Sequence, residues 1–184
     1  METVFETPRL IIRKSTSADV DFFYALWTNP RVMVNVGFPQ GLRVTREEVF
    51  NQLENQSSTE YDSRLVAEKK DTGEKIGECK LGTPDDEGFS ETDVKLFPEF
   101  WARGYGTEIK RGLVNYLFRN TDCRGVVATP NKSNIASQKM QEAVGGVRVD
   151  EGVFEFPEKM REYTVDVAYL KYVVYREKWD GTPS

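Results

Sequence analysis

The residues with the clearest chemical potential form the segment Trp-Ala-Arg-Gly-Tyr-Gly-Thr-Glu at positions 101–108, after an expected strand and at the start of an expected helix. Gly104 and Gly106 allow a tight turn and a close approach of the backbone to a ligand. The free N–H groups at the start of a helix bind anions, and Arg103 can add a charge-assisted hydrogen bond. The segment predicts a phosphate or pyrophosphate site, but an ordinary strand-to-helix loop has the same pattern.

Two better-known phosphate-binding motifs do not fit this segment. A Walker loop requires Gly-Lys-Ser or Gly-Lys-Thr, which does not follow the glycines. A dinucleotide-binding fingerprint requires a third glycine, which is also missing. The surrounding elements must therefore decide which ligand the segment binds.

The absence of histidine restricts the chemistry most. The chain has 184 residues and two cysteines but no histidine, which excludes histidine bases and Ser-His or Cys-His nucleophilic systems. Cys79 and Cys123 lie too far apart in sequence for a Cys-x-x-Cys motif, and two thiols without histidine make a poor zinc site. We expect two reduced, partly buried cysteines and no metal.

Charge and hydropathy limit the class of protein further. Lys plus Arg number 25 and Asp plus Glu 30, a net charge of -5, which argues against nucleic acid and suits a small cationic ligand or a basic peptide. No apolar run is long enough to span a membrane, and the acidic start lacks an export signal, so we expect a cytoplasmic protein. The length predicts one domain over residues 1–184.

The first half of the chain changes from helical to alternating periodicity. Residues 9–13 form a short apolar run typical of a strand, and a helix begins at residues 17–19 and ends before Pro30. Thr45 and Glu48 have the spacing of a capping box, which predicts the start of a second helix. Three strands then follow, at residues 64–69, 75–81 and 91–97, separated by turn sequences.

The second half alternates helix and strand. A helical stripe over residues 109–117 precedes a strand at 125–128. Ser133 or Asn134 caps the next helix, glycines at 145 and 146 end it, and an alternating strand lies around residues 165–169. The order β, α, α, β, β, β, α, β, α, β, β predicts an α/β (α+β) fold in which helices cover a mixed sheet.

Several stretches in this order resemble the GNAT (Gcn5-related) N-acetyltransferases, in particular the RimJ/RimL-like branch that acetylates ribosomal proteins. The longest match is residues 97–108, Phe-Pro-Glu-Phe-Trp-Ala-Arg-Gly-Tyr-Gly-Thr-Glu. Shorter matches are Thr-Pro-Arg-Leu at 7–10, Asn-Pro-Arg-Val-Met at 29–33, Gly77, Asn-Ile-Ala-Ser at 134–137 and Arg-Glu-Lys-Trp at 176–179.

The resemblance implies a central sheet of about seven strands, flanked by helices and splayed between the fourth and fifth strands, with acetyl-CoA in the split. It implies that the pantetheine arm pairs with the strand around Val94 and that the pyrophosphate meets the loop amides. The implied cofactor-binding residues are Val94, Leu96, Phe97, Trp101, Arg103, Gly104, Tyr105, Gly106, Thr107, Asn134 and Ser137. Gln141 stands where many relatives carry a tyrosine acid, so that role cannot be transferred.

Acetyl transfer to an amine is compatible with a chain that lacks histidine, because the amine can attack the thioester directly in a ternary complex. The protein must orient the reactants, stabilise the oxyanion and accept the amine proton. Candidate bases are Glu91, which the resemblance favours, Glu78 and Asp93, and Ser137 is a candidate proton donor near the sulfur. Each of the three carboxylates is also consistent with a solvated strand residue.

The acceptor and the assembly state stay open at this stage. The first two helices, their loop at 33–42 and the terminal strands are expected to form the acceptor site, with Trp27, Phe38, Phe154 and Phe156 as walls or as core. The acceptor is a protein N-terminus or a small amine, and the protein is a monomer or a homodimer. The alternative is a GNAT-shaped module that binds CoA or acyl-CoA without turnover, for sensing or assembly.

Overall fold

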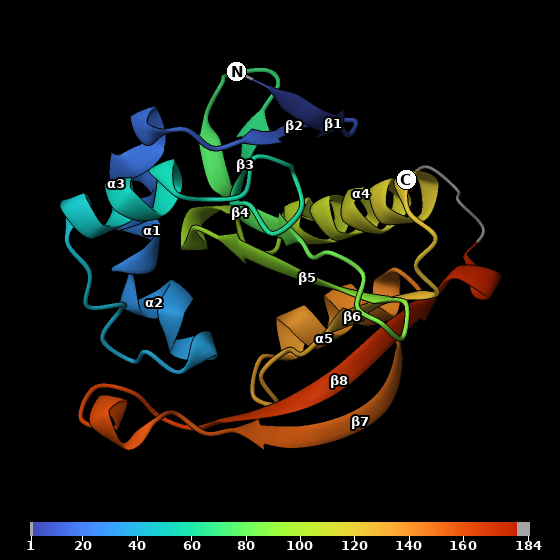
Figure 1. Cartoon of the computed structure of the whole chain (residues 1–184). Helices are drawn as coiled ribbons and strands as arrows, with labels where there is room; N and C mark the ends of the chain where they lie inside the picture. The colour runs from blue at the N-terminus through green and yellow to red at the C-terminus, as the bar shows by residue number, and fades with distance from the viewer. Residues whose placement is uncertain (1, 180–184) are drawn as a thin grey trace.

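In the computed structural model, which describes residues 2–179, one eight-stranded sheet has the strand order β1-β2-β3-β4-β5-β6-β8-β7 (Figure 1). All neighbouring strands are antiparallel except β5 and β6, which are parallel. The strands are β1 (Thr3–Glu6), β2 (Leu10–Lys14), β3 (Leu65–Lys69), β4 (Lys75–Leu81), β5 (Phe89–Leu96), β6 (Gly125–Ala128), β7 (Val147–Phe154) and β8 (Val167–Tyr175).

Helices cover both faces of this sheet. They are α1 (Val20–Trp27), α2 (Pro30–Met33), α3 (Arg46–Glu54), α4 (Tyr105–Asn120) and α5 (Ile135–Ala143). The α1 side chain Trp27 bonds to Glu78 of β4, whereas Lys110 of α4 bonds to Thr92 of β5. Glu78 is paired with Lys95, and side chains alternate along a strand, so α1 and α4 lie on opposite faces of the sheet.

The parallel pair β5 and β6 is joined over only part of its length. Its register pairs Phe89 with Gly125, Ser90 with Val126 and Glu91 with Val127, and no pairing follows although β5 continues to Leu96. The sheet is therefore split between β5 and β6 beyond Glu91, as the resemblance implied. The four residues that follow Thr92 along the open strand span about 13 Å.

Local signals predicted most element boundaries correctly. Thr45 and Glu48 form the capping box of α3, and Asn134 is the N-cap of α5. The sheet has one strand more than the expected seven or so, because Thr3–Glu6 forms an additional edge strand, β1. This four-residue segment has little alternation of its own and is ordered by pairing with β2, which sequence periodicity does not report.

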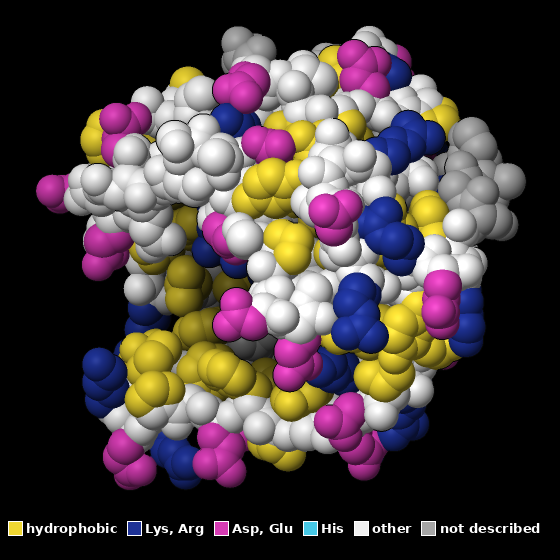
Figure 2. All heavy atoms as spheres, turned by 45° about the vertical axis from the view of Figure 1, so that its right-hand side comes forward, with side chains coloured by type: hydrophobic (Ala, Val, Ile, Leu, Met, Phe, Trp, Pro, Cys, Tyr) yellow, Lys and Arg dark blue, Asp and Glu magenta, His cyan; other side chains and the backbone are white. Residues whose placement is uncertain are grey.

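The described surface has mixed character. Figure 2 shows acidic and basic side chains interspersed on one face, together with a recess in whose depth hydrophobic atoms lie. Among the helices of residues 2–179, none combines the length and hydrophobicity that crossing a bilayer requires. Within the same residues, the Cys, Asp and Glu side chains form no group of three or more that is placed to hold a metal ion.

Candidate functional site

A cavity of about 820 Å³ lies at the split between β5 and β6. The second half of β5, the loop before α4, the first turns of α4 and α5, the segment after β6 and residues near α2 all line it. The lining includes the predicted site residues Glu91, Asp93, Val94, Leu96, Trp101, Gly104, Tyr105, Gly106, Thr107, Asn134 and Ser137. Segments that are far apart in the sequence therefore meet at one cavity.

The open edge of β5 presents backbone groups to this cavity. Phe97 N–H donates to β4 at 3.0 Å, and Glu91 C=O accepts at 2.8 Å from the residue after β4. Because hydrogen-bonding direction alternates along a strand, the C=O of Thr92 and the peptide groups of Val94 and Leu96 face the split instead. An extended ligand can pair with these groups as a β6 strand would.

The N-terminus of α4 lies at the mouth of the split and has the geometry of an anion site. Gly104 is the N-cap with φ 79°, a left-handed conformation that favours glycine. The first helical hydrogen bond within this turn joins Glu108 N–H to Gly104 C=O at 3.1 Å. The N–H groups of Tyr105, Gly106 and Thr107 precede that bond and have no acceptor in the helix. They are available to a phosphate.

Arg9, in the turn between β1 and β2, holds this loop in place. Its guanidinium donates to Glu108 Oε2 at 2.6 Å and to the Arg103 carbonyl at 3.1 Å, and it stacks on the Tyr105 ring at 4.2 Å. Burial opposes ionisation of Glu108, but hydrogen bonds from Thr7 and Arg9 outweigh it and lower the pKa of this carboxyl. The loop is thus oriented by a fixed charge pair.

The carboxylates proposed as bases occupy different environments. Glu91 is exposed, lines the cavity at the closed end of the split, and accepts a long hydrogen bond of 3.4 Å from Thr129. Asp93 also lines the cavity but forms an ion pair with Lys95. Burial opposes ionisation of Asp93, whereas Lys95 favours it and lowers the pKa of the carboxyl. Among the three candidates, Glu91 is the one at the cavity without a described cationic partner.

Glu78 lies away from the cavity lining. Its side chain is 3% exposed, accepts a hydrogen bond of 3.1 Å from Trp27 Nε1 and lies 3.2 Å from Lys95 Nζ. Trp27 is itself 3% exposed and packs in the cluster formed by α1, α2 and α3. Of the two roles left open for Trp27, wall or core, the structure shows the core role.

Two of the implied cofactor-binding residues lie outside the lining. Phe97 packs edge to face against Phe22, at 5.7 Å between ring centroids. Arg103 contributes its carbonyl to the bond with Arg9, while its side chain is exposed. Phe38, Phe154 and Phe156 form a separate aromatic row, with centroid distances of 5.2 and 5.0 Å between neighbours.

Asn134 and Ser137 come together at the start of α5. Asn134 Oδ1 accepts from the Ser137 N–H at 3.1 Å, which is the N-cap bond of the helix. Both residues line the cavity. Gly106 of α4 lies close to Met140 of α5, because a Cβ built on Gly106 would lie 3.1 Å from Met140 Sδ. The lack of a side chain at Gly106 therefore lets α4 and α5 approach closely without closing the cavity.

Sequence reasoning did not single out Thr92 and Lys110 as site residues, and it noted Gln141 only as the replacement for a tyrosine acid, yet all three line the cavity. Lys110 is 1% exposed, and burial lowers the pKa of its ammonium to about 7, although Asp93 and Glu91 partly oppose this effect. A signal was present in the sequence, because Lys110 falls within the apolar stripe of the helix, between Ile109 and Leu113. A lysine on a buried helix face is uncommon unless it is paired.

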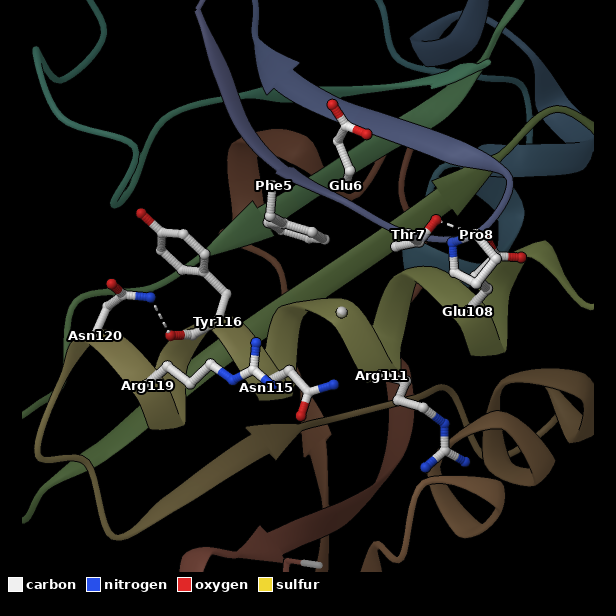
Figure 3. Close-up of a pocket in the computed structure, with 11 residues that line it drawn as sticks. Phe5, Glu6, Thr7, Pro8, Glu108, Arg111, Asn115, Tyr116, Arg119 and Asn120 are labelled. Carbon is white, nitrogen blue, oxygen red and sulfur yellow. Dashed lines mark hydrogen bonds between the residues drawn. The ribbon is translucent and has the colours of Figure 1, made fainter. Parts of the chain in front are cut away.

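A second, smaller cavity of about 310 Å³ lies on the other side of α4, against β1 (Figure 3). Phe5, Thr7 and Pro8 face α4 there, and Arg119 and Asn120 lie at the far end. Its lining contains none of the predicted site residues.

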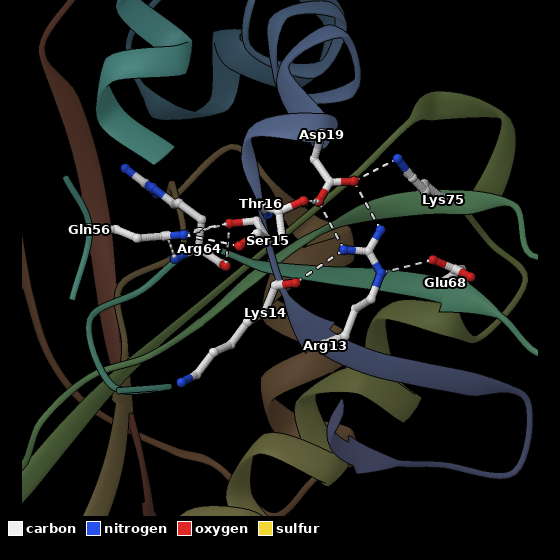
Figure 4. Close-up of polar contacts among 9 residues, drawn as sticks. All are labelled: Arg13, Lys14, Ser15, Thr16, Asp19, Gln56, Arg64, Glu68 and Lys75. Carbon is white, nitrogen blue, oxygen red and sulfur yellow. Dashed lines mark hydrogen bonds and ion pairs between the residues drawn. The ribbon is translucent and has the colours of Figure 1, made fainter. Parts of the chain in front are cut away.

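A buried ion-pair cluster lies away from both cavities and ties β2 to the start of α1 (Figure 4). Arg13 donates hydrogen bonds of 2.9 Å from both terminal nitrogens to Asp19 and one of 3.0 Å from Nε to Glu68. Lys75 adds a bond of 2.6 Å to Asp19. Burial opposes ionisation of Asp19, but these partners outweigh it and hold the pKa of the carboxyl well below its usual range.

Comparison with known sequences identifies related proteins. The family model described as the acetyltransferase (GNAT) domain matches residues 9–147. An uncharacterized N-acetyltransferase, p20 of Bacillus licheniformis, is 27% identical over 179 residues, which cover 96% of this chain and 98% of that protein.

Two solved structures have a similar fold. Spermidine N-acetyltransferase from Vibrio cholerae, in complex with CoA and spermine, has a TM-score of 0.76 and 18% identity, covering 92% of this chain and 96% of that one. Aminoglycoside acetyltransferase AAC(6′)-Ib in complex with coenzyme A has a TM-score of 0.68 and 20% identity, covering 95% and 99%.

Proposed function

Because the chain belongs to the GNAT acetyltransferase family, we propose that this N-acetyltransferase moves the acetyl group of acetyl-CoA to a primary amine by direct attack in a ternary complex. The observation that carries the proposal is the split between β5 and β6, whose cavity joins free strand amides to free helix N–H groups. Residues 1–184 act in this proposal as one N-acetyltransferase domain.

The chain's own groups fit the two ends of acetyl-CoA. The N–H groups of Tyr105, Gly106 and Thr107 suit the pyrophosphate, and the open peptide groups of Val94 and Leu96 suit the amides of the pantetheine arm. Since Trp101 Nε1 already donates to the Leu96 carbonyl at 2.9 Å, the free acceptors on the strand are those of Val94 and Thr92. The thioester then lies near Thr92.

Catalysis in this arrangement requires no protein nucleophile. The open N–H of Val94 donates to the developing oxyanion, and Glu91 takes up the amine proton, directly or through water. Glu91 is preferred over Asp93, which Lys95 neutralises, and over Glu78, which lies outside the cavity lining. Ser137 is the remaining candidate for contact with the sulfur.

The proposal also covers the class of amine that accepts the acetyl group. The neighbouring structures were solved with spermine and with coenzyme A, and the proteins are named for spermidine and aminoglycosides. Here the lining carries two carboxylates, Glu91 and Asp93, of which Asp93 is ion-paired, so a single amine is favoured over a polycation. A protein N-terminus, as in the RimJ/RimL-like branch, or a small amine in the cytoplasm meets this requirement, with the enzyme a monomer or a homodimer.

Two measurements on the full chain test the proposal. Acetyl-CoA at 100 times its dissociation constant is expected to stabilise the protein by about 2.7 kcal/mol in a thermal-shift titration. Release of CoA thiol with a panel of peptides and small amines then identifies the acceptor. An absent thermal shift would refute the cofactor site, whereas binding without turnover on any amine would favour the non-catalytic CoA-binding alternative.

A further inference from the structure

A buried lysine lies at the floor of the split. Lys110 is 1% exposed, lines the cavity, and donates from Nζ to Thr92 Oγ1 at 2.5 Å. Thr92 is the one hydrogen-bond acceptor described for this ammonium among residues 2–179. A charged lysine has three N–H donors, so two remain available on the side of the cavity.

The position of Lys110 along the split matches the reacting end of the cofactor. Lys110 follows Gly106 by four residues, so both lie on the same face of α4, one turn apart. Thr92 directly follows Glu91, the last residue of β5 that pairs with β6. If the pyrophosphate lies at the helix start and the arm runs along β5, the sulfur reaches the closed end of the split beside Lys110.

The charged groups around Lys110 leave it able to gain and lose a proton near neutral pH. Asp93 and Glu91 of β5 favour the ammonium, and burial disfavours it more strongly, which places the pKa at about 7. Residues 125–128 of β6 contain no titratable side chain. On α5, Lys139 is exposed and Glu142 is bonded to Tyr172 at 3.1 Å, so neither acts as a counter-ion.

A second polar side chain lines the same cavity. Gln141 of α5 is 3% exposed, lines the cavity, and has no described hydrogen bond from its side-chain amide. Its amide atoms are not among the described buried side-chain atoms that lack a partner, so they reach the surface of the cavity. A ligand in the cavity can form hydrogen bonds with them.

We propose that Lys110 donates a proton to the sulfur of CoA as the thioester breaks, an inference that rests on the proposed function. The amine nitrogen forms a bond to the acetyl carbon, the carbon–sulfur bond breaks, and its electron pair leaves on sulfur. The sulfur takes a proton from the Lys110 ammonium and becomes a thiol. The proton that the amine loses goes to Glu91 or water, and Lys110 regains a proton from solvent.

The thiol of bound CoA provides a test that does not require the acceptor. In the complex of the full chain with free CoA, Lys110 and the sulfur share a proton, so ultraviolet thiolate absorbance is expected to begin to rise about 1 pH unit or more below the value of about 8.5 for a free thiol. The same protein with desulfo-CoA, which lacks the sulfur, gives the baseline. Lys110→Met is expected to abolish the shift.

Lys139→Met serves as the matched control, since it removes the same charge from an exposed position outside the cavity lining. It is expected to retain the wild-type thiol titration. Equal titrations for wild type and Lys110→Met, with CoA bound to both by calorimetry, would overturn the role of Lys110 while leaving the proposed function intact. Failure of wild type to bind CoA would overturn both.

Turnover gives a second readout once an acceptor is known. Lys110→Met is expected to lower kcat by roughly 10²-fold. This value is at the lower end of the range for general acid catalysis, because a thiolate is already a good leaving group. The KM for acetyl-CoA should stay near that of wild type, and the fall in kcat above about pH 7 should disappear. A raised KM with unchanged kcat would show that Lys110 supports the cavity wall instead.

Discussion

Arg9 Nε and Glu108 Oε2 are joined by a hydrogen bond of 2.6 Å between residues 99 positions apart in sequence. The pair fastens the β1–β2 turn to the first turn of α4, where the free N–H groups lie. The Arg9 side chain is 47% exposed, so its main effect is to orient the loop rather than to stabilise the fold.

We expect Arg9→Ala to weaken CoA binding about fivefold, or about 1 kcal/mol, measured by calorimetry. Arg46→Ala is the matched control, because Arg46 also stacks on a tyrosine, Tyr24, and pairs with a carboxylate, Asp21, at 2.7 Å. None of these three residues lines the cavity. Equal losses of CoA affinity in both variants would contradict the orienting role of Arg9.

Gly104→Ala is expected to reduce both stability and CoA affinity. Its φ of 79° strains any side chain by roughly 1 kcal/mol or more, and relief of that strain would move the free N–H groups. Gly145→Ala has the same backbone strain, with φ 82° and no atom within 4 Å of the new Cβ. Denaturant unfolding should show similar losses of stability for the two variants, whereas calorimetry should show weaker CoA binding for Gly104→Ala alone.

Glu91→Gln is expected to lower kcat by roughly 10²-fold or more with little change in stability, because the exposed carboxylate is proposed to accept the amine proton. Glu87→Gln, in the exposed turn before β5, removes the same charge away from the cavity lining and should leave kcat unchanged. Steady-state kinetics on an identified acceptor would measure both. Wild-type kcat in Glu91→Gln would remove Glu91 from the mechanism.

The pH dependence of stability should report the Asp19 cluster. The folded-state pKa of Asp19 lies below the unfolded value of about 3.9, so the unfolded chain binds more protons between these two values. The contribution of Asp19 is therefore complete above about pH 3.9 and is lost as pH falls from there toward the folded pKa.

We expect Asp19→Asn to destabilise the protein by about 3 to 5 kcal/mol near neutral pH, because it leaves the buried Arg13 without its main partner. The variant should also show a weaker decline of stability in acid. Asp21→Asn, whose carboxylate is exposed, is the control and should follow the wild type in denaturant unfolding at each pH. Parallel acid profiles for Asp19→Asn and wild type would rule out this linkage.

Short-range signals in the sequence were sufficient for most elements and for the loop before α4. Thr45 with Glu48, Asn134 and Gly104 act within one helical turn, so their roles follow from neighbouring residues alone. Gly106 differs, because it leaves room for Met140 of α5. The GNAT resemblance rested on such local segments, and the match over residues 9–147 confirmed the family.

Tertiary structure alone decided which chemical groups share an environment. By sequence, Glu78 and Glu91 are both carboxylates on expected strands. In the structure, Trp27 and Lys95 enclose Glu78, whereas Glu91 lies at the end of the pairing between β5 and β6. The burial of Lys110 results from the packing of α4 against β5 and α5. Burial and ion pairing depend on contacts between residues distant in sequence, and these contacts determine the pKa of each group and its access to the cavity.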